Sequence, residues 1–373
     1  MTARHGRKDR RLIAAVITVA AMILGTGAAA TAIGIAHNID VQSGAPSDVQ
    51  ASAPASLELN AEFVPLVSTQ GLPTPERVSG ADRYAGAVAI SQRAFPNGAP
   101  VVYIATGENF TDALTASPAA IHQGGPLLLT SSGSLIPAVQ AEITRLAPGK
   151  IVVVGGTNSI TPTVYTALQS LAPSITRLGG ADRFEASRNV TSYAFSSGSS
   201  KAYIVTGVDF PDALGTGSAA GLKDAPVILV NGGNTTIDPA TLALLQSLGT
   251  QQVFLAGGPN SLSTGIETTL DAAVSTFRLS GDDRYRGSQV INREAFVDNS
   301  SYVLLASGAN YPDALAGSSW AGAIDAPLYL VPTNCVPDGV LSDIRSRAAT
   351  HIVLLGGTAS LDGGVQSLTS CGW

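Results

Sequence analysis

From about residue 77 onward, short apolar runs alternate along the chain with longer stretches that are Ala-rich or begin at a proline. Between residues 77 and 194, the apolar runs that predict buried strands are 101–105, 126–130, 150–154 and 175–178. The stretches that predict helices are 112–122, 137–146, 161–171 and 182–194. Strands and helices that alternate at this spacing predict βαβ crossovers and a parallel sheet covered by helices on both faces.

The same pattern returns twice more. An Arg-x-x-Gly-x-Asp-Arg motif, followed by Tyr or Phe, begins at Arg77, Arg177 and Arg278, in steps of 100 and 101 residues. Other landmarks keep the same interval: Thr-Gly or Ser-Gly at 106, 206 and 307, Asp-Ala-Leu at 112, 212 and 313, and Gly-Gly at 155, 257 and 356. A repeat of this length predicts three similar α/β modules, each large enough to form a domain.

The repeat sets the expected domain organisation. We place the modules at 77–176, 177–277 and 278–373, after a linker at 37–76 that is rich in Ala, Ser, Pro and Gln. We expect the modules to superpose and to pack around an approximate threefold axis, since a closed arrangement buries equivalent faces equally.

Residues 1–36 have the layout of an export segment. A basic patch between Arg4 and Arg11 precedes an uncharged stretch at 12–36. This is typical of a secretory signal peptide, although 25 uncharged residues are also enough to span a bilayer as an uncleaved anchor. Contact with a membrane is expected only in the second case. Either interpretation places the modules outside the cytoplasm.

The chain has two cysteines, Cys335 and Cys371, both in the third module. In an oxidising compartment such a pair predicts a disulfide that ties the last residues to a loop of the same module. Two independent thiols are the alternative.

Charge restricts the class of ligand. After residue 36 the chain has 16 basic and 26 acidic side chains, a net charge of −10. General attraction to nucleic acid is therefore not expected, and any anion must be bound locally. Six of the thirteen arginines in this part belong to the repeated motif.

The repeated charged residues are the candidate binding residues. Arginine binds carboxylate and phosphate through a planar pair of hydrogen bonds, and parallel sheets bind ligands beyond the carboxyl ends of their strands. The candidates are Arg77, Arg83, Arg177, Arg183, Arg278, Arg284, Asp112, Asp212 and Asp313. Structural alternatives exist for both types, because the arginines could form ion pairs between modules and the aspartates could cap helices.

Signals for catalysis are weak. The histidines do not recur between modules, and no Ser-His-Asp or Cys-His set is suggested. No cluster has the spacing of a metal site, and the Gly-Gly segments lack nucleotide-binding spacing. We therefore expect a binding protein without cofactor or metal, rather than an enzyme.

Taken in order, the Arg-x-x-Gly-x-Asp-Arg motif, Thr-Gly, Asp-Ala-Leu, the Pro-Leu-Leu-Leu strand and Gly-Gly-x-x-Ser resemble the cell-wall-binding repeat 2 family. That family occurs in surface-layer and cell-wall proteins of Gram-positive bacteria. The resemblance covers the chain from Arg77 to its end. It implies three tandem Toprim-like or Rossmann-like modules in a pseudo-threefold arrangement.

The resemblance also implies a function. Proteins of this family attach non-covalently to an anionic cell-wall polymer, so a secreted protein at the cell wall or cell surface is expected. The six motif arginines and the three Asp-Ala-Leu aspartates are the matching positions. The alternatives are a structural or adhesive surface protein and a secreted wall hydrolase or hydrolase enhancer. This chain departs from the family in having Thr111 where Pro is usual, and Ala85-Gly-Ala, Glu185-Ala-Ser and Arg286-Gly-Ser where Glu-Thr-Ala is frequent.

Overall fold

The computed structural model describes residues 71–209 and 213–373. The expected signal or anchor at 1–36, the linker up to residue 70 and the candidate residue Asp212 lie outside the described residues. Within the part that is described, no helix has the length and apolar character needed to cross a membrane.

The first module follows its hydrophobic pattern closely. Its elements are α1 (Arg83–Ala94), β2 (Val101–Thr106), α2 (Thr111–Gln123), β3 (Leu127–Thr130), α3 (Pro137–Leu146), β4 (Lys150–Val154), α4 (Pro162–Gln169) and β5 (Ile175–Leu178). Helices α3 and α4 each begin with a proline, which lacks an N–H and has a backbone angle that suits the first turn.

The second and third modules repeat this order. The second has α5 (Arg183–Ala194), β6 (Lys201–Thr206), α6 (Thr216–Leu222), β7 (Val227–Val230), α7 (Pro239–Ser247), β8 (Gln252–Ala256), α8 (Thr264–Asp271) and β9 (Ser275–Leu279). The third has α9 (Arg284–Ala295), β10 (Tyr302–Ser307), α10 (Pro312–Ala323), β11 (Leu328–Val331), α11 (Asp338–Ser346), β12 (His351–Leu355) and α12 (Gly363–Gln366).

Each module is built on a parallel four-stranded sheet. The strand orders are β3-β2-β4-β5, β7-β6-β8-β9 and β11-β10-β12-β1, in which β1 is Glu76–Val78, so the three sheets have the same topology. Alternate side chains of β2 pack on opposite faces: Tyr103 and Ala105 share a cluster with α2, whereas Val102 and Ile104 share a cluster with α3 and α4. The α/β fold with parallel sheets expected from the sequence is confirmed.

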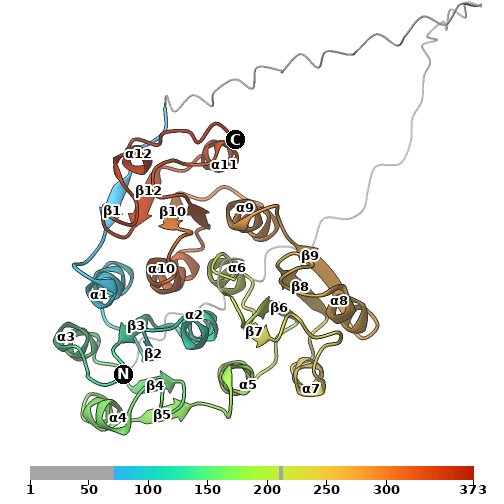
Figure 1. Ribbon diagram of the computed structural model, residues 1–373. Helices are drawn as coiled ribbons and strands as arrows, with labels where there is room; N and C mark the ends of the chain where they lie inside the picture. Colours follow the sequence, from blue (N-terminus) through green and yellow to red (C-terminus); the bar gives the residue numbers. More distant parts are fainter. Residues whose placement is uncertain (1–70, 210–212) are drawn as a thin grey trace, which may run out of the picture. The chain divides into compact units, whose positions relative to one another are not determined.

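The modules meet through helices α2, α6 and α10, which contact one another at the centre of Figure 1. Small side chains allow this close approach, and Gly217 of α6 faces Ser117 of α2 and Ser318 of α10. Around this centre, α1, α5 and α9 each pack on the second strand of their own module and on the central helix of the preceding one. The pseudo-threefold arrangement is thus present in the described part of the chain.

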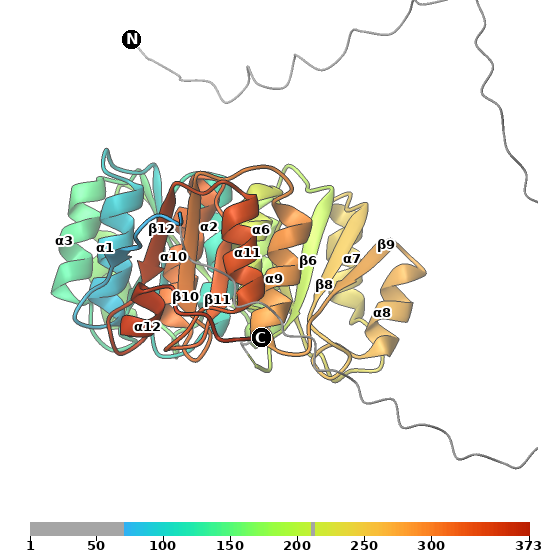
Figure 2. The same cartoon turned by 90° about the horizontal axis from the view of Figure 1, so that it is seen from above.

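The third sheet is completed by a strand from the beginning of the described part of the chain. Strand β1 (Glu76–Val78) pairs with β12 in parallel, with Arg77 opposite Leu354. In the first two modules the equivalent strand, β5 or β9, is supplied by the chain that leads into the next module. Helix α1 packs against α10 where the first and third modules meet (Figure 2).

The predicted disulfide is confirmed. Cys335 and Cys371 are bonded, with Cα atoms 5.1 Å apart. The bond joins the loop before α11 to the last residues of the chain, where Cys371 N–H also donates to Val336 O at 3.0 Å.

Candidate functional site

Three related cavities lie at the three module junctions, beyond the carboxyl ends of the strands. The cavity between modules 1 and 2 has a volume of about 400 Å³, that between modules 3 and 1 about 280 Å³, and that between modules 2 and 3 about 470 Å³. Each is lined by the loop after the first strand and the Gly-Gly turn of one module, and by the Gly-x-Asp-Arg segment of the next. Repetition of the sequence therefore produces a repeated site.

The second arginine of each motif lines its cavity. Arg83, Arg183 and Arg284 each begin a helix and donate from Nη1 to the carbonyl that follows the first strand of their module. The acceptors are Gly107, Gly207 at 2.7 Å and Gly308 at 2.7 Å. Each guanidinium is therefore oriented by one backbone contact while still lining the cavity.

The first arginine of each motif lies elsewhere. Arg77, Arg177 and Arg278 lie on the last strand of each sheet and donate to the carbonyl of the first glycine in the Gly-Gly turn, at 2.8, 3.0 and 2.8 Å. They are not among the residues that line the three cavities. Burial lowers the pKa of Arg77 and of Arg177. These residues therefore hold the turn against the sheet.

The motif aspartates cap helices. Asp82 accepts from the N–H groups of Tyr84 and Ala85, and Asp182 makes the same contacts with Phe184 and Glu185. Asp283 accepts from Arg286 N–H at 2.8 Å. Such a cap satisfies backbone donors that have no partner in the first turn. It also fixes the next residue, which is the cavity arginine.

The Asp-Ala-Leu aspartates do not cap helices in the two modules where they are described. Asp112 and Asp313 lie within the first turn of α2 and α10, and neither helix has a side-chain cap. Their carboxylates instead form part of the cavity lining, where Ser360 Oγ donates to Asp313 at 3.2 Å. The helix-capping alternative is therefore wrong for these two residues.

Burial changes the acidity of both aspartates. It raises the pKa of Asp112 above its ordinary value, while a hydrogen bond from Ser159 and the positive charge of Arg183 act in the opposite direction. The pKa of Asp313 is raised for the same reason, with Ser360 and Arg83 opposing. Each arginine belongs to the neighbouring module, so the aspartate and arginine interact electrostatically across the junction.

The Gly-Gly turn needs its first glycine. Gly155 and Gly356 have φ of 108° and 110°, which residues with a side chain rarely adopt. A Cβ at Gly155 would lie 2.4 Å from Asp112 Oδ2, and one at Gly356 would lie 2.3 Å from Asp313 Oδ2. The turn therefore brings the backbone directly against the buried carboxylate.

Two cavity residues were missed by the sequence analysis. Tyr311 accepts a hydrogen bond from Arg83 Nη1 at 3.3 Å, and its ring lies 5.8 Å from the guanidinium carbon. The second position is Ser159 in module 1 and Ser360 in module 3, where the serine hydroxyl is hydrogen-bonded to the buried aspartate. The repeated Ser in Gly-Gly-x-x-Ser was the available signal, whereas the Arg83–Tyr311 contact joins residues 228 positions apart and has none.

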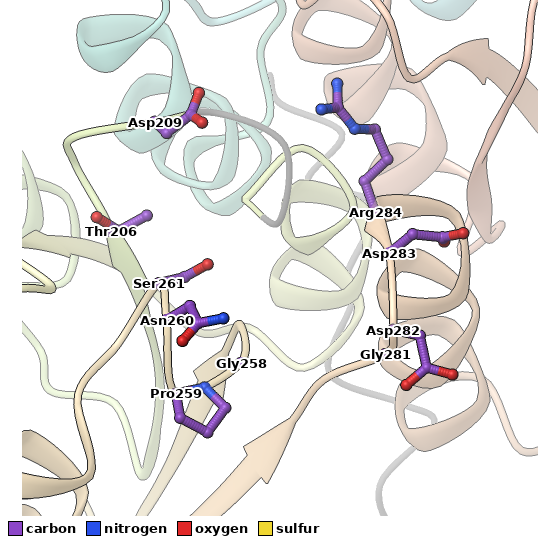
Figure 3. A pocket seen from close by; sticks show the side chains of 10 residues that line it. All are labelled: Thr206, Asp209, Gly258, Pro259, Asn260, Ser261, Gly281, Asp282, Asp283 and Arg284. Atoms are coloured by element: carbon purple, nitrogen blue, oxygen red, sulfur yellow. The ribbon is translucent and has the colours of Figure 1, made fainter.

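The cavity between modules 2 and 3 differs in charge from the others. Asp209 and Asp282 line it, together with Asp283 and Arg284 (Figure 3). The corresponding positions are Asn109 and Ala181 at the junction of modules 1 and 2, and Asn310 and Ala81 at the junction of modules 3 and 1. Within residues 71–209 and 213–373, no group of three or more His, Cys, Asp or Glu side chains is arranged to hold a metal ion.

Comparison with known proteins places this architecture. The family model "Cell wall binding domain 2 (CWB2)" matches residues 77–165, 177–267 and 278–366, one match for each module. The N-acetylmuramoyl-L-alanine amidase LytC of Bacillus subtilis (strain 168) is 27% identical over 286 residues, which cover 77% of this chain and 56% of LytC. The amidase enhancer of the same organism is 26% identical over 301 residues, which cover 81% of this chain and 41% of the enhancer.

Solved structures show the same fold. Cwp6 from Clostridium difficile has a TM-score of 0.71 and 25% identity, covering 82% of this chain and 50% of Cwp6. Cwp8 from the same organism has a TM-score of 0.71 and 24% identity, covering 79% of this chain and 51% of Cwp8, and supports the fold alone. This chain spans about half the length of the relatives it matches. With a family match to all three modules, the chain belongs to the Cell wall binding domain 2 family.

Proposed function

We propose that the three modules attach the protein non-covalently to an anionic polymer of the bacterial cell wall, with the cavity arginines as the contacts to the anion. The observation that carries this proposal is the position of Arg83, Arg183 and Arg284. All three line cavities at equivalent junctions, although the exported part of the chain is acidic overall. Membership of a wall-binding family supports attachment to the cell wall, which is the more general part of the proposal.

The geometry suits a charged ligand on a polymer. A hydrogen bond from Nη1 to a backbone carbonyl orients each guanidinium, and the adjacent capping aspartate fixes the start of its helix. A pre-oriented arginine loses less freedom on binding an anion, and such a contact contributes about 1.5–3 kcal/mol. Several weak sites on one polymer gain further through effective concentration.

The remaining candidates take supporting roles in this proposal. Asp112 and Asp313 line their cavities and accept hydrogen bonds from Ser159 and Ser360. Asp212 is assigned the same role because it occupies the same position in the repeat. Arg77, Arg177 and Arg278 hold the Gly-Gly turn that forms one wall. Export through the N-terminal segment and location at the cell surface belong to the same proposal.

The test is a co-sedimentation assay with purified cell walls, before and after removal of anionic polymers. The variant with Arg83, Arg183 and Arg284 all replaced by Lys keeps the charge but loses the planar fork, so we expect binding to weaken by more than about tenfold at unchanged thermal stability. Added salt should also weaken binding by the wild type.

A matched control replaces three arginines on the same helices by Lys outside the cavities. Arg93, Arg188 and Arg286 lie on α1, α5 and α9 and are engaged with Glu76, Asp238 and Gln289. This control should bind walls like the wild type. Equal binding by the control and by the cavity variant would contradict the proposed contacts, and full binding to walls stripped of anionic polymers would contradict the proposed ligand.

A second candidate is modulation of a wall amidase, which the similarity to an amidase enhancer favours. Its test is the rate at which a purified wall amidase solubilises walls with and without this protein. A rate increase that the triple Lys variant does not produce would show that enhancement requires the same cavities.

A further inference from the structure

We propose that the three junction cavities are not equivalent, and that the anionic group is held at the junctions of modules 1–2 and 3–1 but not at that of modules 2–3. Asp209 and Asp282 determine this difference. The inference rests on the proposed function and concerns which of its sites are used.

The three cavities share their framework. Each has a cavity arginine, a helix-capping aspartate beside it and a Gly-Gly turn on the opposite wall. Because the framework is the same, the residues that vary between the cavities decide how they differ in ligand preference. Among the described lining positions that vary, the two that differ in charge are the residue two positions beyond the glycine that follows the first strand, and the residue between the motif glycine and aspartate.

Both varying positions carry a carboxylate in only one cavity. Asp209 and Asp282 line the junction of modules 2 and 3, where the other two junctions have Asn and Ala. Figure 3 shows Asp209 and Arg284 on opposite sides of this cavity, with Asp282 and Asp283 on the same segment as the arginine. All three aspartates are exposed.

Charged groups just outside the cavities do not cancel this difference. Glu108 accepts hydrogen bonds from Ser131 and Ser132, and Glu185 accepts from Ala181 N–H. Arg286, next to the acidic cavity, donates to Gln289. None of these three side chains lines a cavity. Their effect on a bound anion is therefore screened more strongly than that of Asp209 and Asp282.

The consequence is selective exclusion. An anion beside Arg284 would lie within the same cavity as two additional carboxylates, and like charges repel. The attraction of the anion to the cavity arginine therefore dominates at two junctions, whereas at the third it is outweighed by repulsion from the additional carboxylates. The two remaining anion sites both involve module 1, which provides Arg83 to one and Asn109 and Asp112 to the other.

The experiment measures binding of a fluorescent glycerol phosphate octamer, and of purified walls, to three single variants. Arg83→Lys and Arg183→Lys should each weaken binding about fivefold, whereas Arg284→Lys should leave it within about twofold of the wild type. The pair Asp209→Asn and Asp282→Ala, which copies the other junctions, should tighten binding about threefold or more. In that background Arg284→Lys should weaken binding as strongly as Arg183→Lys.

A matched control removes two exposed carboxylates away from the cavities, by Asp271→Asn and Asp298→Asn. It separates a local effect from a change in net charge, and it should tighten binding by less than half as much as the cavity pair. If Arg284→Lys in the wild-type protein weakens binding as much as Arg183→Lys does, the inference is wrong and the proposed function is unaffected. If none of the three Lys variants binds more weakly, the cavities do not hold the anion and both proposals fall.

Discussion

The first and third modules solve the same structural problem in different ways. Both sheets need a fourth strand beside the third one, and in both an arginine on that strand holds the Gly-Gly turn. In module 1 the strand is β5, and the chain reaches it directly from α4. In module 3 the strand is β1, which comes from the opposite end of the described chain.

The end of module 3 is held by different contacts as a result. Helix α12 has four residues where α4 and α8 each have eight, and the chain after it is tied to the α11 loop by the disulfide. Gln366 donates to Pro75 O at 2.7 Å and accepts from Arg77 at 3.1 Å. In module 3, pairing of β1 with β12 therefore takes the place of the direct chain connection that supplies β5 in module 1. The same pairing brings together the segments that line the cavity between modules 3 and 1.

Removal of residues up to Val78 should have the largest effect. It deletes β1 with the bonds of Arg77 and Pro75, and it leaves the edge of β12 unpaired. We expect a loss of about 3–5 kcal/mol in the free energy of unfolding, from several net hydrogen bonds of about 1 kcal/mol each. Urea unfolding measures this. A truncated protein as stable as the full chain would show that module 3 does not need the closing strand.

Replacement of both cysteines by Ser should come next. The disulfide closes a loop of 36 residues, for which the chain-entropy model gives a stabilisation of about 3–4 kcal/mol. Because the bond lies in module 3, hydrogen exchange should increase first in α11, in α12 and at the chain end, while module 1 stays protected. Uniform loss of protection in all modules would contradict a local role.

Arg77→Ala and Arg177→Ala test whether the two turns are held alike. Each substitution removes charge-assisted hydrogen bonds to a Gly-Gly turn, at an expected cost of about 2 kcal/mol. Thermal unfolding gives the totals, and hydrogen exchange should locate the Arg77 effect in module 3 and the Arg177 effect in module 1. Arg183→Ala, at the exposed cavity position, is the comparison and should cost less.

The smallest effect concerns pH. Burial raises the pKa of Asp112 and Asp313, so the folded chain holds these protons more tightly than the unfolded chain. Their contribution to stability is therefore present below the ordinary carboxyl pKa and is lost as pH rises through the raised values. Asp112→Asn and Asp313→Asn should each remove part of this dependence at pH values above the ordinary carboxyl pKa. If the free energy of unfolding has the same dependence on pH in the wild type and in the variants, this prediction is wrong.

Much of the fold was predictable because its signals are local. The apolar runs at β2 and β4 and the prolines at the start of α3 and α4 gave those elements nearly to the residue. The interval of one hundred residues predicted three modules. Because a closed arrangement buries equivalent faces equally, the repeat also predicted the pseudo-threefold packing. The cysteine pair gave the disulfide.

The two arginines of each motif have different roles that could not be distinguished from the sequence. Arg177 and Arg183 belong to one short motif and are equally repeated, so the sequence assigned both to binding. The structure separates them, because strand pairing directs Arg177 to Gly155 of the same sheet while the cap at Asp182 directs Arg183 into a cavity. Their partners are 22 and 24 residues away along the chain, and only the crossover brings them close.

The sequence alone determined the modules, their secondary structure, the disulfide and the set of candidate residues, because these follow from local periodicity and from repetition. The tertiary structure decided which candidates share a site. It joined β1 to β12, placed Asp313 beside Arg83 of another module and created a cavity at each junction. These contacts connect residues up to 291 positions apart, and they form only when equivalent faces close on one another.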